Sequence, residues 1–214
     1  MDAGFITINT HSSIRIDAGP GALCYVDPFR FEAAPHDADA VLVTHAHFDH
    51  FSPEDLMRVI REDTVFVAPA GMEGNFIGTG IDLGNVTFIS PRSACELLPG
   101  LHVEAVPAYN LDKPFHPEDE GWLGYIITCA DGTRTYVAGD TDDLPENRSL
   151  VCDIALVPAG GTYTMDAVEA AAFVNALAPK IAVPTHYGSV AGVPEDGRVF
   201  AAAVDPAIET VLKL

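Results

Sequence analysis

Short apolar runs separated by turn-forming residues open the chain. Three such runs, β-branched or aromatic in character, lie at 5–8, 13–16 and 22–27. Runs of this length that are bounded by residues such as Asp17 and Gly21 are typical of β-strands. A proline-bearing loop follows at 28–39, and the unbroken apolar run 40–44 then predicts a strand that is covered on both faces. The pattern therefore predicts a meander of strands that leads into a buried strand.

The first helical signal begins at Ser52. Ser52 is a favourable N-cap, Pro53 occupies the first helical position, and an acidic residue, Asp55, follows three residues after the cap. Apolar residues then recur at helical spacing up to Ile60. Together these features predict a helix directly after 44–52.

The rest of the chain alternates apolar runs with loops. Further strands are predicted at 64–68, 86–90, 102–107, 122–129, 133–137, 153–158, 181–185 and 208–212, helices at 165–177 and 195–203, and a loop or short helix at 69–80. The polar, proline-broken segment 108–122 is too long for a tight hairpin, and long loops of this kind are often functional. The Asp131-Gly132 pair predicts a hairpin turn. We expect one domain over 1–214.

Composition narrows the choice of partners. The formal charge is −20, from 31 acidic residues against 11 Lys plus Arg. Such a surface repels polyphosphate backbones, so a nucleic-acid partner is disfavoured. Charge alone says little else about the substrate, and a small molecule is expected from the candidate chemistry. No apolar run approaches the ~20 residues that span a bilayer, so no membrane association is expected. No secretory signal is readable at the start of the sequence, which favours a cytoplasmic protein, and a homo-oligomer is left open.

The cysteines point to the same compartment. Residues 24, 95, 129 and 152 are scattered singly and fall mostly within apolar runs. This spacing predicts buried free thiols in a reducing compartment rather than a disulfide framework or a metal knot.

A histidine cluster directly after the apolar run 40–44 carries the strongest chemical signal. His45, His47, Asp49 and His50 lie within six residues, and the chain has only eight histidines. Imidazole nitrogens with one carboxylate suit zinc, iron or manganese better than calcium or magnesium. Residues two apart in an extended segment point the same way, so His45, His47 and Asp49 are expected to share one face while His50 points elsewhere. One motif can thus serve two adjacent ions.

Two further candidate ligands lie at the ends of other predicted strands. Like His45, Asp140 and His186 each come one or two residues beyond the end of such a strand. Ligand sites in α/β proteins assemble at the carboxyl ends of strands. Asp140 alone is equally compatible with turn chemistry after Gly139. Because His45 and His186 also follow strand ends, a ligand role is favoured for Asp140.

These motifs resemble those of the metallo-β-lactamase superfamily of metal-dependent hydrolases. The resemblance rests on residues 44–50, then Gly139-Asp140-Thr141, and finally 184–188, in matching order and spacing. The segments 10–13, 27–29 and 158–164 look like those of a small single-domain branch related to ascorbate-6-phosphate lactonases. The resemblance covers nearly the whole chain.

The resemblance implies an αββα sandwich, with two mixed sheets flanked by helices, and a centre for two metal ions. It assigns His45 and His47 to the first ion, Asp49, His50 and His186 to the second, and Asp140 to a bridging position. Related proteins carry a histidine after the strand at 102–107, where this chain has Asn110. His116 is favoured as the missing ligand. Asn110 is the alternative, as a weak ligand, a substrate contact or a turn residue, and without either residue a single ion is expected.

The leading functional hypothesis is a metal-dependent hydrolase in which a hydroxide held by the ions cleaves a small ester, lactone or phosphodiester. Two zinc ions are expected, with one ion, or manganese or iron, as alternatives. Asp49, His11 and Asn110 are the candidate catalytic residues, and His11 is expected near the centre. Tyr163 and Tyr187 are interpreted as packing residues in preference to oxyanion donors, and His36 and His102 as structural or exposed.

Two other functions compete with this hypothesis. A nuclease of the same fold is disfavoured by the charge of −20, by the short chain and by the lack of an inserted clamp domain. A non-catalytic binding module with an incomplete metal site is favoured only by Asn110 in place of a histidine.

Overall fold

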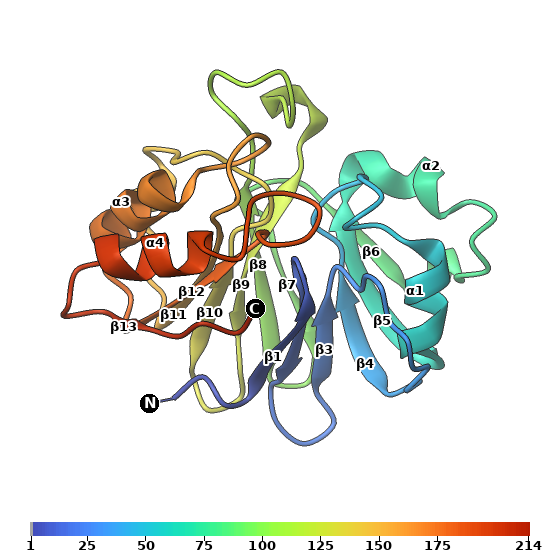
Figure 1. The fold of residues 1–214 in the computed structure, drawn as a ribbon. Coiled ribbons are helices and arrows are strands. Elements are labelled where there is room, and N and C mark those ends of the chain that lie inside the picture. Colours follow the sequence, from blue (N-terminus) through green and yellow to red (C-terminus); the bar gives the residue numbers. More distant parts are fainter. Residues whose placement is uncertain (1) are drawn as a thin grey trace.

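Two mixed β-sheets lie face to face in the computed structural model, which describes residues 2–214 (Figure 1). Two helices cover the outer face of each sheet, α1 and α2 on one side and α3 and α4 on the other. The four layers are helix, sheet, sheet and helix, which confirms the predicted αββα fold.

The first sheet is built from the first part of the chain. It has six strands in sequence order: β1 (Ile6–Thr10), β2 (Ser13–Asp17), β3 (Leu23–Val26), β4 (Ala38–Leu42), β5 (Ile60–Pro69) and β6 (Val86–Ile89). Strands β1 to β3 pair antiparallel, as the predicted meander requires, and β3 to β6 pair parallel.

The second sheet has seven strands in the order β13-β12-β11-β10-β9-β8-β7. They are β7 (Ala94–Leu98), β8 (Leu101–Pro107), β9 (Leu123–Thr128), β10 (Arg134–Val137), β11 (Ile154–Pro158), β12 (Ile181–Thr185) and β13 (Glu209–Thr210). Strands β7 to β10 pair antiparallel and β10 to β13 parallel. The hairpin predicted at Asp131-Gly132 joins β9 to β10, with the Gly132 N–H donating to the Cys129 carbonyl oxygen at 2.9 Å.

The α-helices of residues 2–214 are α1 (Pro53–Val59), α2 (Glu73–Phe76), α3 (Ala167–Leu177) and α4 (Asp196–Ala203), and short 3-10 turns lie at Ala70–Met72, Leu83–Asn85, Glu118–Glu120 and Asn147–Ser149. At α1, the Ser52 side chain accepts a hydrogen bond from the Asp55 N–H, which confirms the predicted cap. At α3, Asp166 and Glu169 form a capping box. No helix within residues 2–214 is long and apolar enough to cross a membrane.

Three apolar layers hold the sandwich together. The largest lies between the sheets, where the inward residues of β1 and β2, such as Ile6 and Ile16, meet Tyr125 and Leu156 of the second sheet. A second layer packs α3 and α4 against the second sheet, and a third packs α1 and α2 against the first. Buried and exposed residues alternate along β1 because only one face of this strand packs against the core.

Several predicted boundaries were wrong. Strand β7 was missed, because it is an edge strand whose half-exposed residues lack an apolar run. Strand β5 begins at Ile60, directly after α1, instead of at residue 64, and its first residues are polar and exposed. Strand β4 ends at Leu42 instead of at residue 44, and β13 spans only two residues of the predicted run 208–212. The cysteines are free as predicted, although only Cys24 and Cys129 are fully buried.

We expect a close backbone contact at Gly124 to be essential for stability. A Cβ atom at Gly124 would lie 2.5 Å from the carbonyl oxygen of Ala138, two residues before Asp140. Gly124→Ala should therefore lower the free energy of unfolding by about 1–3 kcal/mol in denaturant titration. Gly74→Ala in α2 is the control, because a Cβ there meets open space. Equal stability of the two variants would contradict this interpretation.

Candidate metal centre

The histidine motif after β4 folds as a turn. The N–H groups of His50 and Phe51 both donate to the carbonyl oxygen of His47, at 3.0 and 2.8 Å. These bonds coil the segment, so the two-residue alternation of a strand does not continue through it. The expectation that Asp49 shares a face with His45 and His47 was therefore wrong, and Asp49 lies instead with His50.

The first group of possible ligands consists of three histidines. His45 Nε2 lies 3.1 Å from His47 Nδ1, which lies 3.1 Å from His116 Nε2. His116 comes from the loop 108–122, which closes on itself because the Asn110 N–H donates to the His116 carbonyl oxygen at 2.8 Å. The structure thus places His116, the favoured residue, beside the other two histidines.

The second group joins four residues from both sheets. The ligand atoms of His11, Asp49, His50 and His186 all lie within 4.8 Å of one another. The His186 N–H donates to the His11 carbonyl oxygen at 3.1 Å, and the two rings lie 3.8 Å apart. His11 Nε2 lies 3.2 Å from Asp49 Oδ2. His11, which was expected near the centre, is therefore part of it.

Asp140 lies between the two groups. Its Oδ2 atom is 3.2 Å from His116 Nε2 of the first group and 3.0 Å from His186 Nε2 of the second. Its Oδ1 atom is 3.3 Å from His50 Nε2. One carboxylate thus reaches both groups, as expected for a bridging ligand.

Burial and charge set the protonation of these side chains. Burial lowers the pKa of His45 well below its usual value and that of His11 to about 4, so both rings are neutral, the form that binds metal. Burial alone would raise the pKa of Asp140, but the charges of His186 and His50 hold it well below its usual range. Burial would lower the pKa of His50, but Asp140 and Asp27 raise it to about 9.

Polar atoms without partners indicate what the cluster is suited to bind. His50 Nε2, Asp140 Oδ1 and both ring nitrogens of His186 are buried and make no well-directed hydrogen bond among the described residues, although His50 Nε2 and His186 Nε2 lie 3.3 and 3.0 Å from Asp140 oxygens. Buried polar atoms are rarely left in this state. Nitrogen and carboxylate donors that converge without partners fit a divalent cation such as zinc.

Asp27 is a functional residue that the sequence reasoning missed. Its carboxylate is 1 % exposed, lies 2.7 Å from His50 Nδ1 and accepts hydrogen bonds from the Thr44 N–H and hydroxyl at 2.8 and 2.6 Å. A carboxylate behind a histidine fixes the ring and directs the other nitrogen toward a metal. Asp27 directly follows β3, so the strand-end rule that selected Asp140 could also have found it.

The backbone is strained at four residues of this region. His11, Asp27, His116 and His186 have φ values of 55, 48, 56 and 58°, in the left-handed region that favours glycine. Non-glycine residues in this conformation cost free energy and concentrate at functional sites. The fold therefore maintains these residues in place against a local preference for other conformations.

Asn110, a candidate catalytic residue, lies next to His116. Its Nδ2 group donates to the carbonyl oxygens of Phe115 and Tyr163, at 2.9 and 2.7 Å, and lies 3.3 Å from His116 Nδ1. Asn110 is buried and is not among the residues that line the cleft above the cluster. Its contacts favour a positioning role.

Trp122 also borders the centre, although no motif in the sequence selects it. Its ring lies 4.9 Å from that of His45, 4.8 Å from that of His47 and 5.5 Å from that of His116. The remaining histidines, His36 and His102, are exposed, as predicted.

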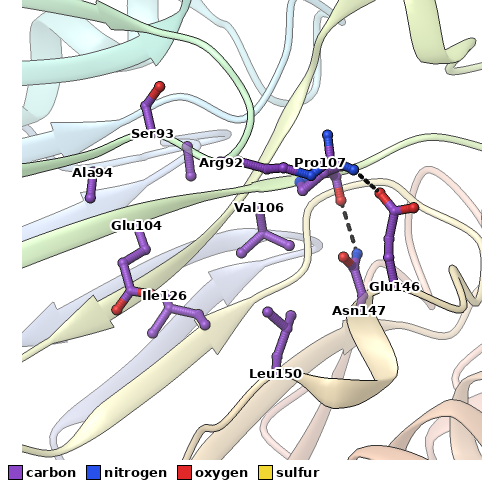
Figure 2. A pocket seen from close by; sticks show the side chains of 11 residues that line it. Arg92, Ser93, Ala94, Glu104, Val106, Pro107, Ile126, Glu146, Asn147 and Leu150 are labelled. Carbon is purple, nitrogen blue, oxygen red and sulfur yellow. Dashed lines mark hydrogen bonds and ion pairs between the residues drawn. The ribbon is translucent and has the colours of Figure 1, made fainter.

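A cleft of about 290 Å³ opens onto the cluster, with His47, His116, Asp140 and His186 at its base. A second cavity, of about 230 Å³, lies beside β8 and β9 (Figure 2). There Arg92 pairs with Glu146, and Asn147 donates to the Pro107 carbonyl oxygen. This second cavity contains none of the clustered histidines, so the first cleft is the candidate substrate site.

Known proteins are similar to this chain in sequence and fold. The Beta-lactamase superfamily domain matches residues 5–186. A UPF0173 metal-dependent hydrolase from Thermococcus kodakarensis is 30% identical, over 94% of this chain and 92% of that protein. The crystal structure of a protein named as a metal-dependent hydrolase from Parabacteroides distasonis is 31% identical, with a TM-score of 0.80, over 98% of this chain and 92% of that one. Igni18, a metallo hydrolase from Ignicoccus hospitalis, shares the fold at 24% identity, with a TM-score of 0.76, over 97% of this chain and 93% of that one.

Both sequence matches extend over most of the chain, and the structural match covers the same two sheets. The matched range includes His45, Asp140 and His186, which the fold brings together. The chain therefore belongs to the UPF0173 metal-dependent hydrolase family of the β-lactamase superfamily.

Proposed function

We propose that this protein is a hydrolase that uses two divalent ions, with zinc as the expected metal, to cleave a small ester, lactone or phosphodiester. The observation that carries the proposal is the position of Asp140 within 3.2 Å of donors from both groups. His45, His47 and His116 would hold the first ion. Asp49, His50 and His186 would hold the second.

Ions held by these residues would supply a bound water whose pKa is lowered toward ~7 and would polarise the bond to be cleaved. Asp49 lines the cleft and is held by His11, so its carboxylate can accept a proton from water at the centre. In the overall reaction, water adds across the ester bond: its oxygen joins the acyl carbon, the C–O bond breaks and the alcohol leaves with a proton. Asn110 would keep His116 in place without touching the substrate.

The alternatives have less support. A binding module with an incomplete site was suggested only by Asn110, and His116 Nε2, 3.1 Å from His47 Nδ1, supports a third nitrogen donor in the first group. A nuclease remains disfavoured by the charge of −20. The resemblance to ascorbate-6-phosphate lactonases stays a prediction from the motifs. The cytoplasmic location stays a prediction from the lack of a readable secretory signal, and a homo-oligomer stays open. One domain over 1–214 is supported by the central core, which draws on both sheets.

Replacement of one histidine of the first group should remove a metal ion without unfolding the protein. We expect His116→Ala, like His47→Ala, to lose about one metal ion per chain and most of its hydrolysis of p-nitrophenyl esters. His102→Ala is the matched control, since His102 is exposed on β8. Metal content is measured by elemental analysis. The single tryptophan, Trp122, should report occupancy of this group by its fluorescence. Unchanged metal content and activity in both variants would refute the two-ion proposal.

Asp27 should control metal affinity without contacting the metal. Asp27→Asn keeps the shape of the side chain but removes the charge that fixes His50, so we expect metal affinity to fall by about 10- to 100-fold. Competition with a chelator measures this change. The control is Asp63→Asn, which changes an exposed carboxylate on β5 and should bind metal with the affinity of the wild type. An affinity of Asp27→Asn equal to that of this control would contradict the assigned role.

A further inference from the structure

The walls of the cleft above the metal centre differ sharply from its base. The polar lining residues all belong to the histidine and aspartate cluster: His47, Asp49, His116, Asp140 and His186. The other lining residues are aromatic or aliphatic: Phe48, Phe115, Tyr163 and Val190. Reacting groups and binding surface are thus separated, with the chemistry at the base and apolar contacts above it.

Phe115 and Tyr163 form one preorganised wall. Their rings lie 4.9 Å apart in an edge-to-face arrangement, which is a favourable geometry for aromatic pairs. They come from different loops, but the Asn110 side chain donates to the carbonyl oxygens of both residues. These bonds tie the backbone of both residues to Asn110 before any ligand binds, which lowers the entropic cost of binding.

Phe48 contributes a second apolar surface. It lies within the histidine motif between His47 and Asp49, yet 66% of its surface is exposed. Phe115, which lines the same cleft, is 40% exposed. Large apolar side chains that are exposed together at a cleft mark a ligand surface more often than isolated ones do.

The cleft lacks positive side chains. Among the described residues, no lysine or arginine lines it. Lys113, on the same loop as Phe115, pairs with Asp142 and lines a different cavity, and Arg30 stacks on Phe29 beside another. Sites that recognise phosphate or carboxylate groups usually supply Lys or Arg. The net charge of −20 further disfavours anionic ligands.

We infer that the substrate is a small, neutral carboxylic ester or lactone with an apolar, preferably aromatic, acyl group that packs between Phe48 and the Phe115–Tyr163 wall. This inference rests on the proposed hydrolase function and narrows it, because it excludes phosphorylated substrates. The volume of about 290 Å³ is at the small end for ligand sites, which fits one ring beside the bond to be cleaved.

Ketones that resemble the ester but cannot be hydrolysed test this inference independently of turnover. We would measure their dissociation constants by NMR titration of the metal-loaded protein. Benzylacetone should bind roughly 10- to 100-fold more tightly than butanone, which lacks only the phenyl ring. Levulinate, with a carboxylate in place of that ring, should bind more weakly than benzylacetone. Equal affinity for benzylacetone and butanone, no binding of benzylacetone, or tighter binding of levulinate would overturn the inference.

Variants then locate the binding surface. Phe115→Ser and, independently, Phe48→Ser should each reduce the preference for benzylacetone at least about fivefold. Both side chains are partly exposed, so their loss should leave the fold intact. Val151→Ser, which alters an equally apolar but distant residue that is 73% exposed, should keep the preference. An unchanged preference in both phenylalanine variants would refute the assigned surface.

Hydrolysis separates the failure of this inference from the failure of the proposed function. The wild type should cleave p-nitrophenyl hydrocinnamate with a higher kcat/KM than p-nitrophenyl acetate. Cleavage of both esters without preference would support the hydrolase and refute the apolar substrate. Cleavage of neither, together with the expected ketone preference, would refute the ester hydrolase but keep the apolar surface.

Discussion

The buried carboxylate of Asp140 is the constraint on which the rest of this structure depends. It is 4 % exposed and lies within 3.3 Å of ring nitrogens from His50, His116 and His186. A buried charge is costly unless opposite charge or strong donors compensate for it. The three histidines come from three separate parts of the chain, so the two sheets and the 108–122 loop must all be in place before Asp140 is compensated. A bound cation would complete the compensation of this buried negative charge.

A second layer of contacts prepares this arrangement. Asp27 fixes His50 and the backbone of Thr44, while the Thr44 carbonyl oxygen accepts from the Leu123 N–H of the opposite sheet at 3.0 Å. The same short segment therefore joins the first sheet to the second and carries the histidine motif. Because the sheets are also clamped by the central apolar core, the positions of the ligands are a consequence of the sandwich itself. This coupling explains why strained backbone conformations at four of the residues persist.

Much of the fold and of the ligand set could be predicted from sequence, for physical reasons that differ between residues. The strands before His45, Asp140 and His186 consist mostly of buried residues, and local pattern located their carboxyl ends to within two residues. The edge strand β7 has no such run. The grouping of Asp49 with His50 depends on two hydrogen bonds to the His47 carbonyl oxygen, which a strand-based reading of the motif cannot foresee. Asp27 satisfies the strand-end rule, but its contact with His50, 23 residues away in sequence, could be seen only in the structure.

The hydrogen bonds of Asn110 that close the 108–122 loop position both a metal ligand and an apolar residue of the cleft. The bond between the Asn110 N–H and the His116 carbonyl oxygen returns the loop to the centre, and the Asn110 side chain ties this return to the Tyr163 turn. His116 and Phe115 are adjacent in sequence, so a movement that displaced the metal ligand would also displace the apolar wall. A histidine at position 110 would supply a nitrogen without this tie. Asn110 thus links the metal site to the surface that we infer selects the substrate.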